Sequence, residues 1–451
     1  MALQSKGSTM ESIKPIFWPD PETSAMPSMD PTREEFNILI LYFVPFMLVL
    51  FLGLPAWAQP SSTLSLQTAI NQALQRAPII ASSKAVLSAA EGNELQAGSF
   101  ANPEIGFEAE NIAGSGDYRG ANAAEYTYSL SQKVELGGKR ISRRNLAGAE
   151  RQAIQKDMQA AKLDLIRDVT IAYGNVLVAD EKLKLAVERN NLAADVLANV
   201  SQRVSAARDP LIYQSQADIA LATARLEHQK CQRDLQLAKR KLASYWGSHS
   251  LTDNLESAVL TSSTSPESLD VYQSRLSNTP NIQRYEDLLL ARTNALQLEK
   301  SQNIPDPSFS VGVRDFRETG HQAMVAGMSM PIPVFNRNAG NIARASSEVI
   351  QAEQNARQAR LDAEQALHEA WLDWQTAYAE ATELQNSIIP SAQEALKLSR
   401  QGYERGRFSF LEILNAQRTL AEAQEQRLNT LQRQLHAKAT VIRLTTPTGD
   451  Q

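Results

Sequence analysis

A very long uninterrupted helical pattern constrains the fold of this chain more than any other feature. Residues 139–207 contain no proline and only two glycines, Gly148 and Gly174. At about 1.5 Å per residue, a helix over this stretch is roughly 100 Å long. Its second half carries apolar residues at spacings that alternate between three and four, which is a coiled-coil pattern. A turn at residues 208–210 and a returning helix over residues 211–246 predict that two long helices pair here.

Two stretches replace the helical period with the alternation of a β-strand. In residues 104–110 apolar side chains alternate with glutamates and a glycine, and the alternation resumes over residues 125–136 after a loop rich in Gly and Asn. The second pair covers residues 308–314 and 324–334. Each pair predicts a hairpin with one apolar face and one polar face.

The hairpin and the helical pair both occur twice, about 200 residues apart. Residues 131–140 align with residues 329–338 without a gap, at an offset of 198. Residues 204–217 align with residues 403–416 at an offset of 199. Because two independent landmarks share nearly the same offset, the sequence predicts an internal duplication.

The order of elements is the same in both halves. Short helices flank Pro78 and Pro280, and a long helix over residues 338–405 is expected to kink at Pro390 before a last helix that reaches about Leu444. The expected regions are a disordered extension with a signal peptide (1–58), a first repeat (59–262) and a second repeat (263–451).

Four strands with an apolar face cannot close into a barrel within one chain. Bacterial single-chain barrels begin at about eight strands, and open sheet edges are not tolerated in hydrocarbon. Three copies would supply twelve strands and remove every edge. We therefore expect a mainly α-helical protein with a small transmembrane β part, a trimeric α/β-barrel channel with four strands and long coiled-coil helices per protomer. The alternative is a soluble β-layer packed on other elements, but nearly all the rest of the chain is long helix.

The N-terminal region carries a targeting signal. Residues 38–54 form an uncharged apolar run, and residues 56–58 have the small-x-small form that signal peptidase cleaves. We expect a secretory signal cleaved after Ala58. An uncleaved membrane anchor is the alternative, because the run is near spanning length. The start codon is open between Met1, Met26 and Met29.

Residues 402–420 resemble the periplasmic helical turn of the TolC family of outer-membrane efflux channels. The matching positions are Gly402, Tyr403, Gly406, the run 411–414 and residues 416–420. The strand-to-helix segments, residues 132–140 and 331–338, resemble the cobalt–zinc–cadmium branch of that family. The resemblance covers residues 64–444 and implies a homotrimer with a shared β-barrel and a long α-helical tunnel.

This resemblance implies a passive efflux channel in the outer membrane of a Gram-negative bacterium, extending into the periplasm. Its implied partners are outer-membrane lipid, a periplasmic adaptor (a membrane fusion protein) and an inner-membrane transporter of the resistance–nodulation–division class. Metal ions, drugs and organic solvents all fit as substrates. The alternative function is a periplasmic coiled-coil scaffold or adaptor without a pore, which leaves the amphipathic strands unexplained.

The resemblance and the turn chemistry single out three sets of residues. A periplasmic aperture is expected at Tyr403, Glu412, Asn415 and Asp209. The adaptor-docking turns are expected to use Gly402, Gly406, Arg407, Ser409, Leu411, Arg208 and Pro210. The strand-to-helix joints are Gly137, Gly138, Pro331 and Pro333, where glycine and proline permit a sharp bend.

Two positions depart from the family's pattern at the aperture. Asn415 is neutral where the family has an acid, and Phe408 stands where one member has a tethering arginine. Three copies of Glu412 around an axis would favour a cation or a cationic partner, whereas the alternative is a solvated glutamate on a helix face. Asp209 either joins the acidic rim or is an ordinary turn residue beside Pro210.

Other classes of function lack a signal in this sequence. The net charge is −5, and no clustered excess of Lys or Arg indicates nucleic-acid binding. No glycine-rich phosphate loop or nucleophile–base pattern indicates an enzyme, and no cofactor is expected. The five histidines are scattered without metal-ligand spacing, so no metal site is expected. The single cysteine, Cys231, excludes an intramolecular disulfide.

Overall fold

The computed structural model of the protein describes residues 63–251, 254–257 and 264–449. These residues belong to one compact unit, Ser61–Gln451. The expected N-terminal extension and signal peptide, residues 1–58, lie outside the described residues. In chain order the elements are β1 (Thr63–Leu64), α2 (Leu66–Arg76), α3 (Pro78–Ala97), β2 (Glu104–Glu110), the 3₁₀-helix η1 (Gly116–Tyr118), β3 (Glu125–Lys133), α4 (Lys139–Ser205), α5 (Leu211–Ser244), β4 (Asn254–Leu255), α7 (Leu269–Leu276), α8 (Pro280–Gln302), β5 (Ser308–Phe316), β6 (His321–Ser329), α9 (Ala339–Glu383), the π-helix η2 (Leu384–Ile388), α10 (Ile389–Glu404) and α11 (Phe410–Thr445).

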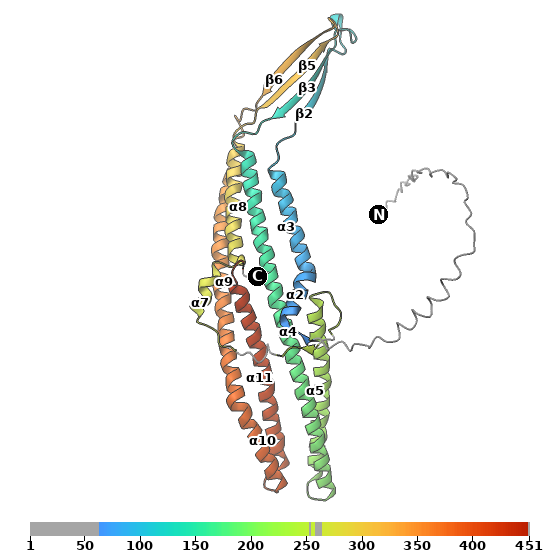
Figure 1. Ribbon diagram of the computed structural model, residues 1–451, viewed down its shortest axis with the longest axis vertical. Coiled ribbons are helices and arrows are strands. Elements are labelled where there is room, and N and C mark those ends of the chain that lie inside the picture. Colours follow the sequence, from blue (N-terminus) through green and yellow to red (C-terminus); the bar gives the residue numbers. More distant parts are fainter. Residues whose placement is uncertain (1–62, 252–253, 258–263, 450–451) are drawn as a thin grey trace, which may run out of the picture. The chain divides into compact units, whose positions relative to one another are not determined.

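Long helices make up most of the described chain. α4 runs unbroken from Lys139 to Ser205 and α5 returns alongside it, so the predicted helical pair is confirmed. α9 and α10 pair with α11 in the same way, and both helical turns lie at the end opposite the four-stranded sheet (Figure 1). Within the described residues, no helix is both long enough and apolar enough to cross a membrane.

The long helix predicted over residues 338–405 is interrupted shortly before Pro390. α9 ends at Glu383, residues 384–388 form a π-helix, and α10 begins at Ile389. Proline cannot donate a backbone hydrogen bond and its ring clashes with the preceding turn, so the helix widens locally. A kink was predicted at Pro390; the structure has a π-helical turn directly before this residue.

The two hairpins form one antiparallel sheet with the strand order β2-β3-β5-β6. Its register places Ile105 opposite Leu130, Leu130 opposite Val311 and Val311 opposite Ala326, so apolar residues line up across all four strands. Glutamate, serine, threonine, glycine and arginine residues dominate the other face. The predicted hairpins with one apolar and one polar face are confirmed.

The apolar face of this sheet is uncovered in the single chain. Ile105 is 89% exposed and Met324 is 80% exposed. The other exposed large apolar side chains of this face are Phe107, Tyr128, Leu130, Phe309, Val311, Val313 and Met328. A continuous apolar surface of this kind marks contact with another molecule or with lipid. The edge strands β2 and β6 each pair with one neighbour only.

Two of the strands, β3 and β6, end earlier than the alternation in the sequence predicted. β3 ends at Lys133 and β6 ends at Ser329, whereas the alternation continues to residues 136 and 334. Gly137 and Gly138 have φ angles of 69° and 72°, which take the backbone out of the strand region. After β6, two prolines remove the N–H groups that a ladder needs. The predicted C-terminal ends of β3 and β6 were therefore wrong.

A small parallel sheet joins the start of the described chain to the segment that follows α5. β1 pairs with β4, and the hydroxyl of Tyr173 on α4 contacts the backbone of both segments. This hydroxyl donates to the carbonyl oxygen of Leu64 at 2.7 Å and accepts the N–H of Glu256 at 2.9 Å. Tyr173 is fully buried among apolar residues of α2, α4 and α5, so its hydroxyl must find partners of this kind.

Candidate functional site

The turn between α4 and α5 is closed by a residue with a left-handed backbone. α4 ends at Ser205, Ala207 has a φ of 54°, and the N–H of Arg208 donates to the carbonyl oxygen of Arg203 at 2.9 Å. Pro210 then occupies the N-cap position of α5. A left-handed alanine is unusual, because its Cβ crowds the backbone carbonyl.

The turn between α10 and α11 repeats this geometry with a glycine at the left-handed position. Gly406 has a φ of 69°, and the N–H of Arg407 donates to the carbonyl oxygen of Gly402 at 2.8 Å, as in a Schellman motif. The predicted left-handed glycine is confirmed. Ser409 takes the N-cap position as expected, but its hydroxyl donates to the Glu412 carboxylate and caps no backbone N–H.

A buried carboxylate joins the two turns. The Nε and Nη2 atoms of Arg203 donate to the two carboxylate oxygens of Asp209 at 2.7 and 3.1 Å. The hydroxyl of Tyr403, on α10, donates to the same carboxylate. The guanidinium of Arg203 also lies 4.6 Å from the centre of the Tyr403 ring. The side chain of Asp209 is only 7% exposed and that of Arg203 is 28% exposed, so the three residues form one polar cluster around a buried carboxylate, the Asp209 link.

The electrostatics of the Asp209 link favour a charged carboxylate and a neutral phenol. The hydrogen bonds from Arg203 lower the pKa of Asp209 below its usual value, although burial acts to raise it. Burial, together with the hydrogen bond to Asp209, raises the pKa of Tyr403 to about 12. At neutral pH the cluster therefore consists of one ion pair and one phenol that donates to it.

Apolar packing surrounds the Asp209 link. Tyr403 is buried in a cluster with Val200, Phe410 and Ile413, and its ring centre lies 6.0 Å from that of Phe410. Gly402 lies directly against the ring of Phe408, where a Cβ atom would come within 2.1 Å of the ring. These contacts hold the end of α10 against the start of α11.

The other two expected aperture residues lie in the open on α11. Glu412 is exposed in the first turn of the helix and accepts the Ser409 hydroxyl. Asn415 is exposed one turn further, where its backbone carbonyl accepts the hydroxyl of Thr419 at 3.0 Å. In the part of the chain that the structure describes, no hydrogen bond or ion pair connects either side chain to Asp209. The structure thus brings Tyr403 and Asp209 together and leaves these two apart.

The expected docking residues lie mainly on the outside of the turns. Gly402 is the buried exception. The exposed members are Arg208, Pro210, Gly406, Arg407, Ser409 and Leu411.

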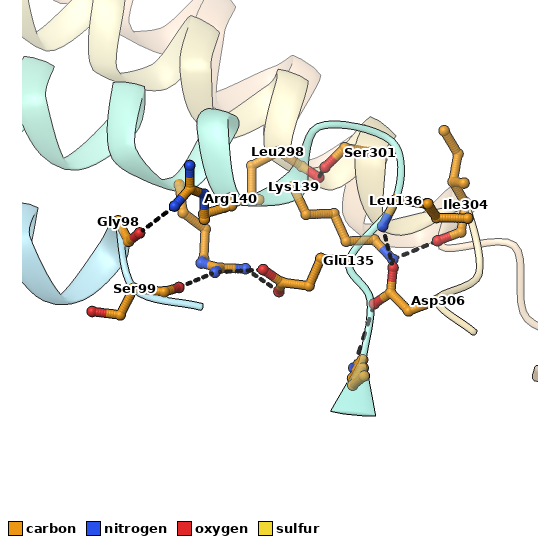
Figure 2. Close-up of polar contacts among 12 residues, drawn as sticks. Gly98, Ser99, Glu135, Leu136, Lys139, Arg140, Leu298, Ser301, Ile304 and Asp306 are labelled. Atoms are coloured by element: carbon orange, nitrogen blue, oxygen red, sulfur yellow. Dashed lines mark hydrogen bonds and ion pairs between the residues drawn. The ribbon is translucent and has the colours of Figure 1, made fainter. Parts of the chain in front are cut away.

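A buried ion pair anchors the joint between β3 and α4 (Figure 2). The Nζ atom of Lys139 lies 2.5 Å from Oδ1 of Asp306 and 2.5 Å from the carbonyl oxygen of Ile304. The N–H of Leu136 donates to the same carboxylate oxygen at 3.0 Å. Burial acts to raise the pKa of Asp306, but the hydrogen bonds from Lys139 and Leu136 bring it below its usual value.

The expected joint glycines lie inside this arrangement. A Cβ atom on Gly137 would come within 2.6 Å of the Ile304 side chain, so only glycine fits without a shift. Gly138 is the left-handed N-cap of α4. Beside it, Arg143 binds both carboxylate oxygens of Glu135, at 2.5 and 2.9 Å. The joint therefore ties the sheet to the helices through charged side chains on both sides.

The joint between β6 and α9 is longer than the joint between β3 and α4. Pro331 and Pro333 lie in an irregular link, and the left-handed N-cap of α9 is Asn338. The side-chain amide of Asn338 donates to the carbonyl and carboxylate oxygens of Glu299 at 2.9 and 2.7 Å. The ungapped alignment of residues 131–140 with residues 329–338 pairs Gly138 with Asn336. The structure instead has Asn338 at the N-cap of α9, where Gly138 stands in α4, so this alignment fails at the start of α9.

Three residues that hold these sites together were not identified from the sequence. Arg203 has the same local surroundings as any cation on a helix surface. Lys139 and Asp306 are separated by 167 residues, and nothing near either one indicates its partner.

The described residues contain no group of three or more His, Cys, Asp or Glu side chains that could hold a metal ion. The Nε2–H of His436, which is partly buried, donates a hydrogen bond to the side-chain oxygen of Asn175 at 2.9 Å. Burial, with the nearby Lys241 charge, lowers the pKa of His436. The single cysteine, Cys231, is buried on α5, and burial raises its pKa.

Comparison with known proteins connects this architecture to one family. The family model described as outer membrane efflux protein matches residues 69–248 and 271–446. The chain is 29% identical over 363 residues to the cobalt-zinc-cadmium resistance protein CzcC of Cupriavidus metallidurans, covering 79% of this chain and 84% of that protein. It is 24% identical over 301 residues to the nickel-cobalt-cadmium resistance protein NccC of Alcaligenes xylosoxydans xylosoxydans, covering 67% and 68%.

Solved structures show the same fold at low sequence identity. A structure of CusC superposes with a TM-score of 0.73 at 18% identity, covering 87% of this chain and 94% of that chain. A membrane protein from Pseudomonas aeruginosa gives a TM-score of 0.74 at 19% identity, covering 84% and 92%.

Proposed function

This chain belongs to the outer membrane efflux protein family, and on that premise we propose that it forms the outer-membrane exit duct of a tripartite efflux system. The duct is passive, because it supplies a wall, an aperture and docking surfaces, while an inner-membrane transporter supplies the energy. One observation carries this proposal. The sheet has an uncovered apolar face and an opposite polar face, as the wall of a water-filled pore in lipid requires.

Three copies of the chain complete the wall. The edges of β2 and β6 are unpaired, which hydrocarbon does not tolerate. In a homotrimer, β6 of each chain pairs with β2 of the next, so that twelve strands close a barrel without an edge. Exposed apolar side chains on the helices, such as Ile219 and Leu226 on α5 and Leu361 and Leu372 on α9, support contact between copies.

Each copy consists of two repeats, residues 59–262 and 263–451. The family model matches the chain twice, and each matched segment contains a hairpin followed by a long helical pair. A trimer of such chains has six helical pairs around its tunnel, and therefore six turns at its periplasmic end.

The transported class that the likeness supports is metal cations. Two relatives are named for resistance to cobalt, zinc, cadmium and nickel. An inner-membrane transporter of the resistance–nodulation–division class delivers the substrate, and a periplasmic adaptor docks onto the helical turns. A passive wall of this kind also passes other small toxic molecules, so the transporter sets the selectivity.

The aperture lies at the helical turns. The Asp209 link ties the α4–α5 pair to α10 and holds the turns together. Glu412 and Asn415 line the entrance, where three glutamates around one axis attract cations. Opening requires the Asp209 link to break or to move as a unit.

A matched pair of neighbouring substitutions in β5 tests the duct. Val311 is on the apolar face and Ser310 is on the polar face. We expect Val311→Glu to prevent insertion into planar bilayers, since a charged side chain on the lipid-facing side of a membrane strand destabilises the inserted barrel. Ser310→Glu should still insert and conduct. Equal insertion of both variants, or a wild-type protein that stays soluble without detergent and never conducts, would refute the duct and favour a scaffold without a pore.

The contribution of Glu412 is tested in the same bilayers. We expect Glu412→Ala to reduce the cation preference of single channels, because it removes one charge per chain from the entrance. Glu353→Ala, at an exposed glutamate on α9 outside the turns, is the control. An unchanged reversal potential in Glu412→Ala would keep the channel and remove this residue from the aperture.

A further inference from the structure

The two helical turns present the same pair of exposed side chains. In each, an arginine directly follows the left-handed residue, and an aliphatic side chain occupies the second position of the next helix. The pairs are Arg208 with Ile212 and Arg407 with Leu411, and both members of the second pair lie 199 residues after those of the first. Ile212 is 58% exposed and Leu411 is 52% exposed.

The positive charges of both arginines lack a partner in the described chain. Among the residues that the structure describes, the guanidinium groups of Arg208 and Arg407 form no ion pair and no hydrogen bond. Asp209, the acid nearest in sequence to Arg208, is enclosed and bonded to Arg203 instead. The Asp209 link therefore removes the carboxylate that would otherwise neutralise the first turn.

The turns as a whole carry an excess of positive charge. Residues 203–212 and 400–412 contain five arginines and three carboxylates, although the full chain has a net charge of −5. With the Arg203–Asp209 pair set aside, four arginines face two glutamates. The two turns, at the end of the molecule opposite the sheet, thus carry a net positive charge, whereas the net charge of the whole chain is negative.

We propose that each turn binds the tip of a helical hairpin that carries carboxylates beside an apolar side chain. The proposal rests on the proposed function, since it specifies the chemistry of the partner that docks there. A carboxylate of the hairpin pairs with Arg208 or Arg407, and its apolar side chain covers Ile212 or Leu411. Guanidinium groups suit this role, because they bind carboxylates with two hydrogen bonds.

The arrangement favours a protein hairpin over an anionic membrane. Binding of basic segments to lipid uses clusters of about four to eight Lys or Arg residues, whereas each turn here presents few cations with glutamates between them. The same Arg–aliphatic spacing occurs in both turns at the offset of 199 that relates the two repeats, so each turn offers the same single cation beside the same single apolar side chain.

Binding of designed peptides to the full-length protein in nanodiscs tests this proposal. The probes are two labelled two-helix peptides that differ only at the turn, which holds glutamates beside a leucine in one and lysines beside the same leucine in the other. Fluorescence anisotropy should show binding of the acidic peptide only. Its affinity should fall about tenfold between roughly 0.02 M and 0.5 M salt, since the pairs are near the surface.

Variants locate the contact. We expect the double variant Arg208→Glu with Arg407→Glu to weaken binding of the acidic peptide about fivefold or more, because each bound peptide loses the one ion pair of its turn, which contributes roughly twofold to fivefold, and meets a like charge instead. Arg357→Glu is the matched control, an exposed arginine on α9 far from the turns in sequence and without an ion pair in the described chain. The neutral variant Arg208→Gln with Arg407→Gln should give an intermediate loss, and thermal unfolding checks that each variant is folded.

The outcomes separate this proposal from the proposed function. Channels that conduct normally but fail to bind the acidic peptide at about 1 mM, or that bind both peptides equally, overturn the docking proposal and leave the duct intact. Flotation with phosphatidylglycerol vesicles that is lost in the double variant, without peptide binding, assigns the turns to a membrane instead. Protein that never conducts overturns the duct itself.

Discussion

The hydroxyl of Tyr403 donates a hydrogen bond to the carboxylate of Asp209, a residue 194 positions earlier in the chain. Because Asp209 lies in the turn between α4 and α5 while Tyr403 lies on α10, this bond joins the two helical pairs at their turns. Arg203 holds the carboxylate from the other side, so the position of Asp209 depends on both pairs.

Removal of this hydroxyl should loosen the turns. We expect Tyr403→Phe to lower the free energy of unfolding by about 1–2 kcal/mol, since a hydrogen bond to a charged group is lost while Arg203 remains. Single-channel conductance should rise, because the two helical pairs can then separate more easily. Planar-bilayer recordings measure this directly.

Tyr213→Phe is the control for that experiment. Tyr213 packs against Phe410 with a centre-to-centre distance of 5.6 Å, in the same cluster. Its substitution removes a tyrosine hydroxyl outside the Asp209 link and should leave the conductance unchanged. If both variants conduct alike, the bond between Tyr403 and Asp209 does not restrain the turns.

Alkaline pH should weaken the same link. A tyrosine in the unfolded chain ionises near pH 10, whereas Tyr403 in the folded protein keeps its proton to about pH 12. The stability that this residue contributes is complete below pH 10 and is lost as the pH rises from about 10 to 12. We therefore expect the difference in melting temperature between wild type and Tyr403→Phe to shrink over this range. A constant difference across it would contradict the raised pKa of Tyr403.

The two left-handed residues of the turns should respond oppositely to substitution. We expect Ala207→Gly to stabilise the protein by about 0.5–1 kcal/mol, because it relieves the crowding of a Cβ atom at positive φ. Gly406→Ala should destabilise it by about 1 kcal/mol, although no other atom lies near the added Cβ. Chemical denaturation of both variants measures the pair, and a shift of the same sign in each would refute the shared geometry.

The buried ion pair at the first joint should be sensitive to the loss of one partner. We expect Asp306→Asn to cost about 3–5 kcal/mol, because the Lys139 ammonium stays buried without a carboxylate. The double variant Lys139→Met with Asp306→Asn should recover most of this loss, since the buried ammonium is removed and Lys133, which also pairs with Asp306, is exposed to water. Thermal unfolding in detergent compares them.

The partly exposed pair next to it supplies the control. Glu135→Gln breaks the bond to Arg143 at a position where water can replace it, so a loss of about 1 kcal/mol or less is expected. A loss as large as that of Asp306→Asn would mean that burial is not what makes the Lys139 pair important.

Much of the local structure was readable from the sequence. Period-two alternation located all four strands of the sheet, and the absence of proline located α4 to within two residues at its end. Gly406 was correctly identified as a left-handed turn residue, and a π-helical turn directly precedes Pro390, where a kink was predicted. These features depend on neighbouring residues alone. The strand ends were misjudged, since the alternation continues into links whose glycines and prolines prevent pairing.

The sequence by itself therefore determined which segments are helices, which are strands and which face of each strand is apolar, because periodicity and turn chemistry are local properties. Only the tertiary structure decided which charges meet. Asp209 is a buried, hydrogen-bonded carboxylate because α10 places the Tyr403 hydroxyl beside it. The charge of Lys139 is balanced because the segment before β5 places Asp306 beside it. Such pairs depend on how two distant hairpins pack, and no pattern along either segment records the distance between them.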